Sequence, residues 1–202
     1  TTGKINHDDI ENGTNGQVLG SGSSATDMVW MIQPVELTAA AAKPIPTIPC
    51  ASLATGEVSG GGNYLAYDYL YFDATTSEGA YWQPFMVPPG FVASANSSVT
   101  VHVYWFSSAT GQTCVWKVNL GAFAAGETLS ATPSASVTIN SATGAEVGLE
   151  HATGTINLSS AVALQDLLYP SILRLPADGS DDYTNDAALK LVVFEFKMGH
   201  GN

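Results

Sequence analysis

Alternation of apolar and polar side chains is the strongest constraint in this chain, and it is clearest in SVTVHVYWF at residues 98–106. One set of alternate positions carries Val99, Val101, Val103 and Trp105. The other set carries Thr100, His102, Tyr104 and Phe106. Successive side chains of a strand point to opposite faces of a sheet, whereas a helix repeats every 3.6 residues. The segment is therefore predicted to be a strand with its first set of side chains in the core.

Other segments rich in aromatic or β-branched residues are also predicted to be strands. They cover residues 64–72, 80–87, 113–123, 135–140, 155–159, 167–175 and 188–196. Turn sequences such as DATTSEG, PPG and SSATGQ lie between them. Short strands separated by turns are typical of sandwiches, so we expect an all-β, antiparallel, jelly-roll-like sandwich. For residues 159–168, SSAVALQDLL, a short helix is the alternative, because a serine precedes spaced apolar residues.

The first 34 residues differ in composition and are predicted to form an extended N-terminal attachment arm. Within them, GTNGQVLGSGSSATDMVW at residues 13–30 is rich in glycine and serine and almost uncharged, and it ends in a tryptophan. Ordering such a stretch costs roughly 1–2 kcal/mol per residue, so we expect it to become ordered on a large partner surface. Its expected contact residues are Gln17, Val18, Leu19 and Trp30.

A second section, residues 35–62, is predicted to be a connector. Pro44, Pro46 and Pro49 lie close together in it, and three consecutive glycines end it. Proline lacks the N–H that a helix interior or a central strand requires, so neither is expected here. The jelly-roll sandwich would then occupy residues 63–202.

Charge excludes some classes of partner. The chain of 202 residues has 18 acidic residues, six Lys plus Arg, and a net charge of −12. No basic stripe is present to neutralise phosphates, so nucleic acid is not expected as a partner. An anionic membrane surface would repel the chain, and no run is apolar enough to span a bilayer. Charged residues are only 12% of the total while apolar residues are 45%, which predicts close contacts between subunits and a homotrimer.

A catalytic arrangement is not visible, and we expect that the protein is not an enzyme. The four histidines, at positions 7, 102, 151 and 200, are far apart in the sequence and are expected to be solvent or interface residues. No nucleophile motif or phosphate-binding glycine loop occurs. Two of the carboxylates Asp68, Asp73, Glu78 and Glu195 could form a glycosidase pair, but 18 acids produce such pairs by chance. Cys50 and Cys114 fit no metal pattern, and two buried thiols are expected, with a disulfide as the alternative.

The densest acidic cluster is ADGSDDYTND at residues 177–186. It offers carboxylate oxygens of the kind that calcium binds, from Asp178, Asp181, Asp182 and Asp186. The spacing is not that of an EF-hand, so a solvated acidic loop is the favoured interpretation and calcium the weaker one. No other cofactor is indicated.

Aromatic residues crowd the middle of the chain. They include Tyr64, Tyr67, Tyr69, Tyr71, Phe72, Tyr81, Trp82, Tyr104, Trp105 and Trp116. Flat rings suit the faces of sugars, so a carbohydrate platform is one interpretation. Packing in the core and at a subunit interface is the favoured one.

The order of several motifs resembles a group of virion proteins of tailed bacteriophages. The residues that carry this resemblance are 72–76 (FDATT), 88–91 (PPGF), 101–105 (VHVYW), Trp116 and the pair Leu173–Arg174. It covers about residues 44–196. The stretch at residues 13–30 is similar to segments of phage fibre and tail proteins that link an anchor to a trimeric body.

This resemblance implies a trimeric jelly roll displayed on a virion after synthesis in the host cytoplasm, and a strand rather than a helix at residues 167–175. The expected function is that of a capsid decoration or head-fibre protein that docks by its N-terminal arm. Its expected partners are other copies of itself and the major capsid protein or another virion protein. The alternative is a receptor-binding tail or fibre-tip module that recognises host surface glycans.

Overall fold

The computed structural model describes residues 31–50, 53–60, 63–91, 98–128, 135–145, 148–158, 162–163 and 165–198. The chain divides into two units, Thr1–Trp30 and Met31–Asn202, and all described residues belong to the second. The expected contact residues of the arm, Gln17, Val18, Leu19 and Trp30, therefore lie outside the described residues. No helix in the described part of the chain is long and apolar enough to cross a bilayer.

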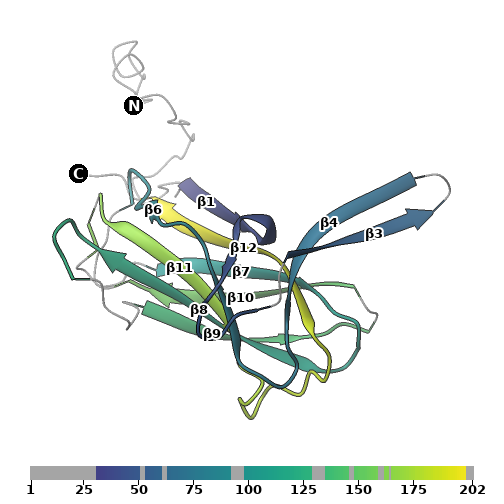
Figure 1. Ribbon diagram of the computed structural model, residues 1–202. Helices are drawn as coiled ribbons and strands as arrows, with labels where there is room; N and C mark the ends of the chain where they lie inside the picture. Colours follow the sequence, from purple (N-terminus) through teal and green to yellow (C-terminus); the bar gives the residue numbers. More distant parts are fainter. Residues whose placement is uncertain are drawn as a thin grey trace, which may run out of the picture. The chain divides into compact units, whose positions relative to one another are not determined.

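The described residues form two antiparallel sheets that pack face to face (Figure 1). Sheet A consists of β1 (Met31–Thr38), β3 (Leu53–Gly60), β4 (Asn63–Phe72), β7 (Ser98–Phe106), β10 (Leu149–Asn157) and β12 (Ala187–Met198). Sheet B consists of β2 (Lys43–Pro44), β5 (Glu78–Tyr81), β6 (Phe85–Met86), β8 (Thr113–Phe123), β9 (Ala135–Ala142) and β11 (Leu167–Arg174). One short 3-10 helix, η1 (Ala39–Ala41), follows β1.

Strand order identifies the sandwich as a jelly roll. The central order in sheet A is β4-β12-β7-β10, and the facing order in sheet B is β5-β11-β8-β9. From β4 onward the chain crosses between these two sets at each step except between β8 and β9, which are neighbours. Two interlocked Greek keys of eight strands have this order. The prediction of an all-β jelly-roll sandwich is therefore confirmed, and β11 occupies the segment expected to be a strand.

The predicted alternation of buried and exposed side chains in β7 is confirmed. Val99, Val101, Val103 and Trp105 are fully buried, and the residues between them are partly exposed on the other face. Across the core, Trp105 lies edge-on to Trp116 of β8 with a centroid distance of 6.0 Å. The Trp105 indole N–H donates to Ser141 Oγ at 2.8 Å, so this buried polar group has a partner.

Three strands lie where a connector was expected, and the predicted boundaries at residues 35–62 are wrong for the described residues. β1 pairs with β12 from Met31↔Met198 to Thr38↔Leu191, and a boundary after residue 34 would cut this strand in half. Val35 and Leu37 pack against the core. The expectation that no central strand contains Pro44 is confirmed, since this proline lies in the two-residue strand β2 at the edge of sheet B.

β3 and β4 form a hairpin that extends beyond sheet A (Figure 1). β4 pairs with β12 only through Leu70, Tyr71 and Phe72. Its earlier residues pair with β3 alone, from Leu53↔Leu70 to Gly60↔Asn63.

Candidate functional site

Rings of aromatic and histidine side chains gather on the outer face of sheet A, the face turned away from the core. They come from alternate positions of three strands: Tyr67, Tyr69 and Tyr71 of β4, His102, Tyr104 and Phe106 of β7, and His151 of β10. We call this set the outer ring face. Each of these side chains is at least partly exposed, whereas Leu70, Phe72 and Trp105 at the intervening positions are buried.

The tyrosines of β4 lead from the hairpin onto the body of the sheet. Ring centroids are 4.7 Å apart for Tyr69 and Tyr71, 5.7 Å for Tyr67 and Tyr69, and 4.5 Å for Tyr67 and Phe106. The pKa of Tyr71 is raised to about 12, first by a hydrogen bond with the Tyr69 side chain and second by burial. The Tyr71 phenol is therefore neutral at physiological pH.

Two histidines and a tyrosine form a group within the outer ring face. Tyr104 and His151 are direct cross-strand partners of β7 and β10, and their rings stack at 4.5 Å with 12° between planes. The rings of His151 and His102 lie nearly parallel, with centroids 5.2 Å apart and 9° between planes. Leu149, two residues before His151, extends the surface and is 57% exposed. Tyr104 and His151 thus cover part of each other's faces, and the three rings together form a compact, partly exposed group.

Polar groups line one end of these stacked rings. His102 Nδ1 and His151 Nε2 lie 2.9 Å apart in a hydrogen bond, so one ring donates and the other accepts. His102 Nε2 lies 3.2 Å from Glu195 Oε2 of β12. The two atoms are close enough for an ion pair, but the His102 Nε2 atom forms no hydrogen bond. The Glu195 carboxylate, 34% exposed, keeps acceptor capacity toward solvent.

The base of the hairpin closes the other end. The Tyr67 ring lies over the backbone of its cross-strand partner Gly56, where an added Cβ would come within 2.5 Å of the ring. Lys190 places its Nζ 5.8 Å from the centroid of the Tyr67 ring and donates to the carbonyl oxygen of Asp68 at 3.2 Å. Glycine at position 56 is therefore required for Tyr67 to lie flat against its partner strand.

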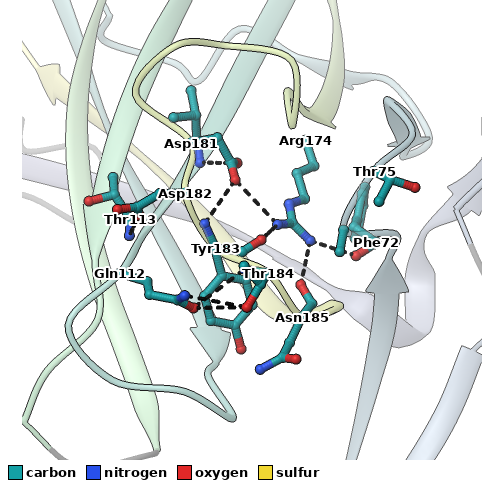
Figure 2. A network of polar contacts seen from close by, with 12 residues as sticks. Phe72, Thr75, Gln112, Thr113, Arg174, Asp181, Asp182, Tyr183, Thr184 and Asn185 are labelled. Carbon is teal, nitrogen blue, oxygen red and sulfur yellow. Dashed lines mark hydrogen bonds and ion pairs between the residues drawn. The ribbon is translucent and has the colours of Figure 1, made fainter.

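Arg174 organises a second polar cluster, at the loop between β11 and β12 (Figure 2). Its guanidinium is fully buried, and Nη1 donates to the carbonyl oxygens of Phe72 at 3.1 Å and Asn185 at 2.7 Å. Nη2 donates to the carbonyl oxygen of Tyr183 and contacts Asp181 Oδ1 at 3.3 Å. One buried cation thus holds the loop against β4 and β11.

The carboxylates proposed for calcium serve the same loop. Each accepts a hydrogen bond from a backbone amide: Asp181 from Val115, Asp182 from Thr113, Asp178 from Ser180 and Asp186 from Ala74. Among the residues that the structure describes, no three Asp, Glu, His or Cys side chains are grouped so that they could hold a metal ion. The calcium hypothesis therefore gains no support, and the acidic cluster is explained by amides that need acceptors.

Asp73 and Glu78, considered for a glycosidase pair, also bind groups of the protein itself. Hydrogen bonds from the Thr75 hydroxyl and from the amides of Thr75 and Thr76 lower the pKa of Asp73. Glu78 accepts from the Asp73 amide at 2.7 Å, while burial raises the pKa of Glu78. These two residues hold the turn between β4 and β5.

Both cysteines are free and buried, as expected. Burial raises the pKa of the Cys50 thiol to about 11, and burial raises the pKa of Cys114 as well. Because the thiolate is the reactive form, neither residue should react with Ellman's reagent in the native protein at pH 8, and both should react in 6 M guanidinium. A native thiol that reacts as fast as free cysteine would contradict this burial.

Sequence reasoning placed His102 on the outer side of its strand but did not connect it with His151. These residues are 49 positions apart, and only the register of β7 against β10 brings them together. The period-two spacing of tyrosines at 67, 69 and 71 was the available signal for the hairpin end of the face.

Comparison with known proteins gives a distant structural likeness. No protein-family model matches the chain, and no curated protein matches it. A solved carbohydrate-binding module, described for its specific recognition of mannan, aligns with 85% of this chain and 100% of its own length. The two are 6% identical with a TM-score of 0.39, a likeness that carries no argument about this chain's function.

Proposed function

We propose that this chain is a structural protein of a tailed-phage virion, a homotrimeric capsid decoration or head-fibre protein that docks through its N-terminal residues. The sequence resemblance supports this proposal, and the jelly roll is a fold that viral capsid and lectin domains use. The proposed partners are other copies of the chain and the major capsid protein or another virion protein. In this role the sandwich is displayed outward, away from the docking residues.

A recognition role for the displayed sandwich is supported by one observation, the outer ring face of sheet A. A sandwich needs apolar rings on its inner faces, and a group of rings on an outer face is typical of a ligand or partner surface. The second candidate function is accordingly a receptor-binding tail or fibre-tip module that recognises host surface glycans.

The chemistry of the face favours a neutral glycan. A pyranose has a flat face of C–H groups and a rim of hydroxyls. The outer ring face offers partly exposed aromatic and histidine rings to the C–H groups, and the partly exposed Glu195 carboxylate offers an acceptor for a hydroxyl. The net charge of −12 disfavours polyanionic glycans such as sulfated or uronic-acid polymers.

We expect the purified full chain to bind a neutral host-surface polysaccharide on a glycan array and in calorimetry. Tyr104→Ala and His151→Ala should each weaken binding about tenfold or more, the usual effect of removing an aromatic contact at the centre of an interface. Both positions lie outside the core, so melting temperatures should change little.

Tyr169→Ala is the matched control. Tyr169 lies on the outer side of β11 in sheet B, where its ring packs on Phe123 at 5.3 Å. It should leave glycan binding unchanged. Equal losses from Tyr104→Ala and Tyr169→Ala, or the absence of binding to any neutral polysaccharide of the host envelope, would remove this proposal.

The location on the virion is decided by copy number. Quantitative mass spectrometry of purified particles should give hundreds of copies for a shell protein and only a few for a tail or fibre tip. Absence of the chain from purified particles would contradict both virion roles.

A further inference from the structure

The β3–β4 hairpin carries two open strand edges. β3 is the last strand on its side of sheet A, and among the described strands it pairs with β4 alone. Residues 63–69 of β4 pair only with β3 among the described strands, since β12 reaches no further than Leu70. Two-stranded ribbons are marginally stable in water, and open edges offer unpaired N–H and C=O groups to other strands.

The base of the hairpin is fixed in one orientation. β12 changes register between Leu189 and Leu191, and Lys190 lies at this irregularity. From there its ammonium donates to the Asp68 carbonyl oxygen and lies over the Tyr67 ring, which packs on Phe106. Three contacts thus hold the base of the β3–β4 hairpin. In the outer part of the hairpin, β3 and β4 pair only with each other among the described strands.

From these observations we propose that the β3–β4 hairpin is the element through which copies of this chain assemble. β3 of one copy pairs with residues 63–67 of β4 in the next copy. This pairing is head-to-tail, and three hairpins arranged in this way close a ring that leaves no edge open. This inference rests on the proposed homotrimer and specifies which strands form the interface between its subunits.

The hairpin is the part of the chain where charge least opposes the approach of a second copy. Each copy carries a net charge of −12, so copies repel one another over most of their surface. Residues 58–66, VSGGGNYLA, contain no acidic or basic residue and are therefore a segment where two such chains can approach. β3 has eight residues, enough to cover all five of residues 63–67 of β4.

The test is the mass of the full chain in solution, measured by size-exclusion chromatography with light scattering. The wild type should have about three protomer masses. A variant in which residues 58–65 are replaced by Asn-Gly keeps Glu57 and Ala66 as the pair that closes the turn, and it keeps the Gly56, Tyr67 and Lys190 contacts. This shortened variant should be monomeric, with a melting temperature close to that of the monomeric wild-type domain at high dilution.

A second variant, Val58→Asp with Leu65→Asp, keeps the hairpin length and adds like charge at two directly opposed positions. It should also be monomeric, whereas Tyr104→Ala should remain a trimer. A trimer that persists in both hairpin variants would overturn the assembly role of the hairpin and leave the proposed homotrimer standing. A monomeric wild type at micromolar concentration would overturn both.

Discussion

Replacing Arg174 with leucine is expected to lower the free energy of unfolding by about 3–5 kcal/mol, the usual cost of removing one partner from a buried ion pair. Leucine fills much of the space but donates no hydrogen bond. The groups that would lose their arginine donor are the Asp181 carboxylate and the carbonyl oxygens of Phe72, Tyr183 and Asn185. Urea titration followed by tryptophan fluorescence measures this change.

Two further variants make the interpretation specific. Arg174→Lys keeps the charge, but a single ammonium cannot reach acceptors on both sides of the guanidinium, so an intermediate loss is expected. Lys43→Met, at an exposed residue of β2, should change stability by no more than about 0.5 kcal/mol. A loss of less than about 1 kcal/mol in Arg174→Leu would show that the loop between β11 and β12 does not depend on this cluster.

Removing residues 1–30 is expected to leave the stability of the sandwich nearly unchanged, whereas removing residues 1–38 should lower it by about 3 kcal/mol or more. The second deletion takes away β1, which pairs with β12 along all eight of its residues. It also removes Val35 and Leu37 from the core surface, and burying an aliphatic side chain contributes about 1.5–3 kcal/mol. Thermal and urea unfolding of the two truncated proteins, compared with the full chain, measure the difference.

The protein that lacks residues 1–30 can also be tested for its presence on assembled particles. The protein that lacks residues 1–30 should stay folded and oligomeric but be missing from assembled particles, and Trp30→Ala should reduce occupancy to a smaller extent. If residues 1–30 prove necessary for folding, the boundary at Met31 is wrong. If the truncated protein still covers particles fully, attachment does not use these residues.

Strands with a strong local pattern were predictable from sequence. The predicted segments at residues 98–106 and 113–123 coincide with β7 and β8, because a period of two is a property of the strand itself. β1 and β3 were missed, although they are as long as many of the others. Proline and glycine near them indicated a connector, and their stability comes from pairing, in the case of β1 with a strand about 150 residues away in sequence.

The candidate site was predictable only in its parts. The favoured interpretation assigned the aromatic residues to the core and to a subunit interface. The core assignment is correct for Phe72, Trp105 and Trp116, whereas Tyr67, Tyr69 and Tyr71 lie on the outer face. The composition of a segment does not indicate which of its two faces meets the core. The stacking of His151 on Tyr104 depends on register between strands, which no local pattern contains.

The pairing of β1 with β12 gives the sandwich two distinct poles. The described chain enters the sheet at Met31 and ends beside it at Met198, which are direct partners, so both ends of the described chain lie at one pole. The turn at residues 107–112 follows the end of β7 that pairs with the start of β12, so it belongs to the opposite pole. A reporter domain inserted in this turn would therefore lie at the pole opposite Met31 and Met198, and under the proposed attachment through residues 1–30 it should leave binding to particles intact.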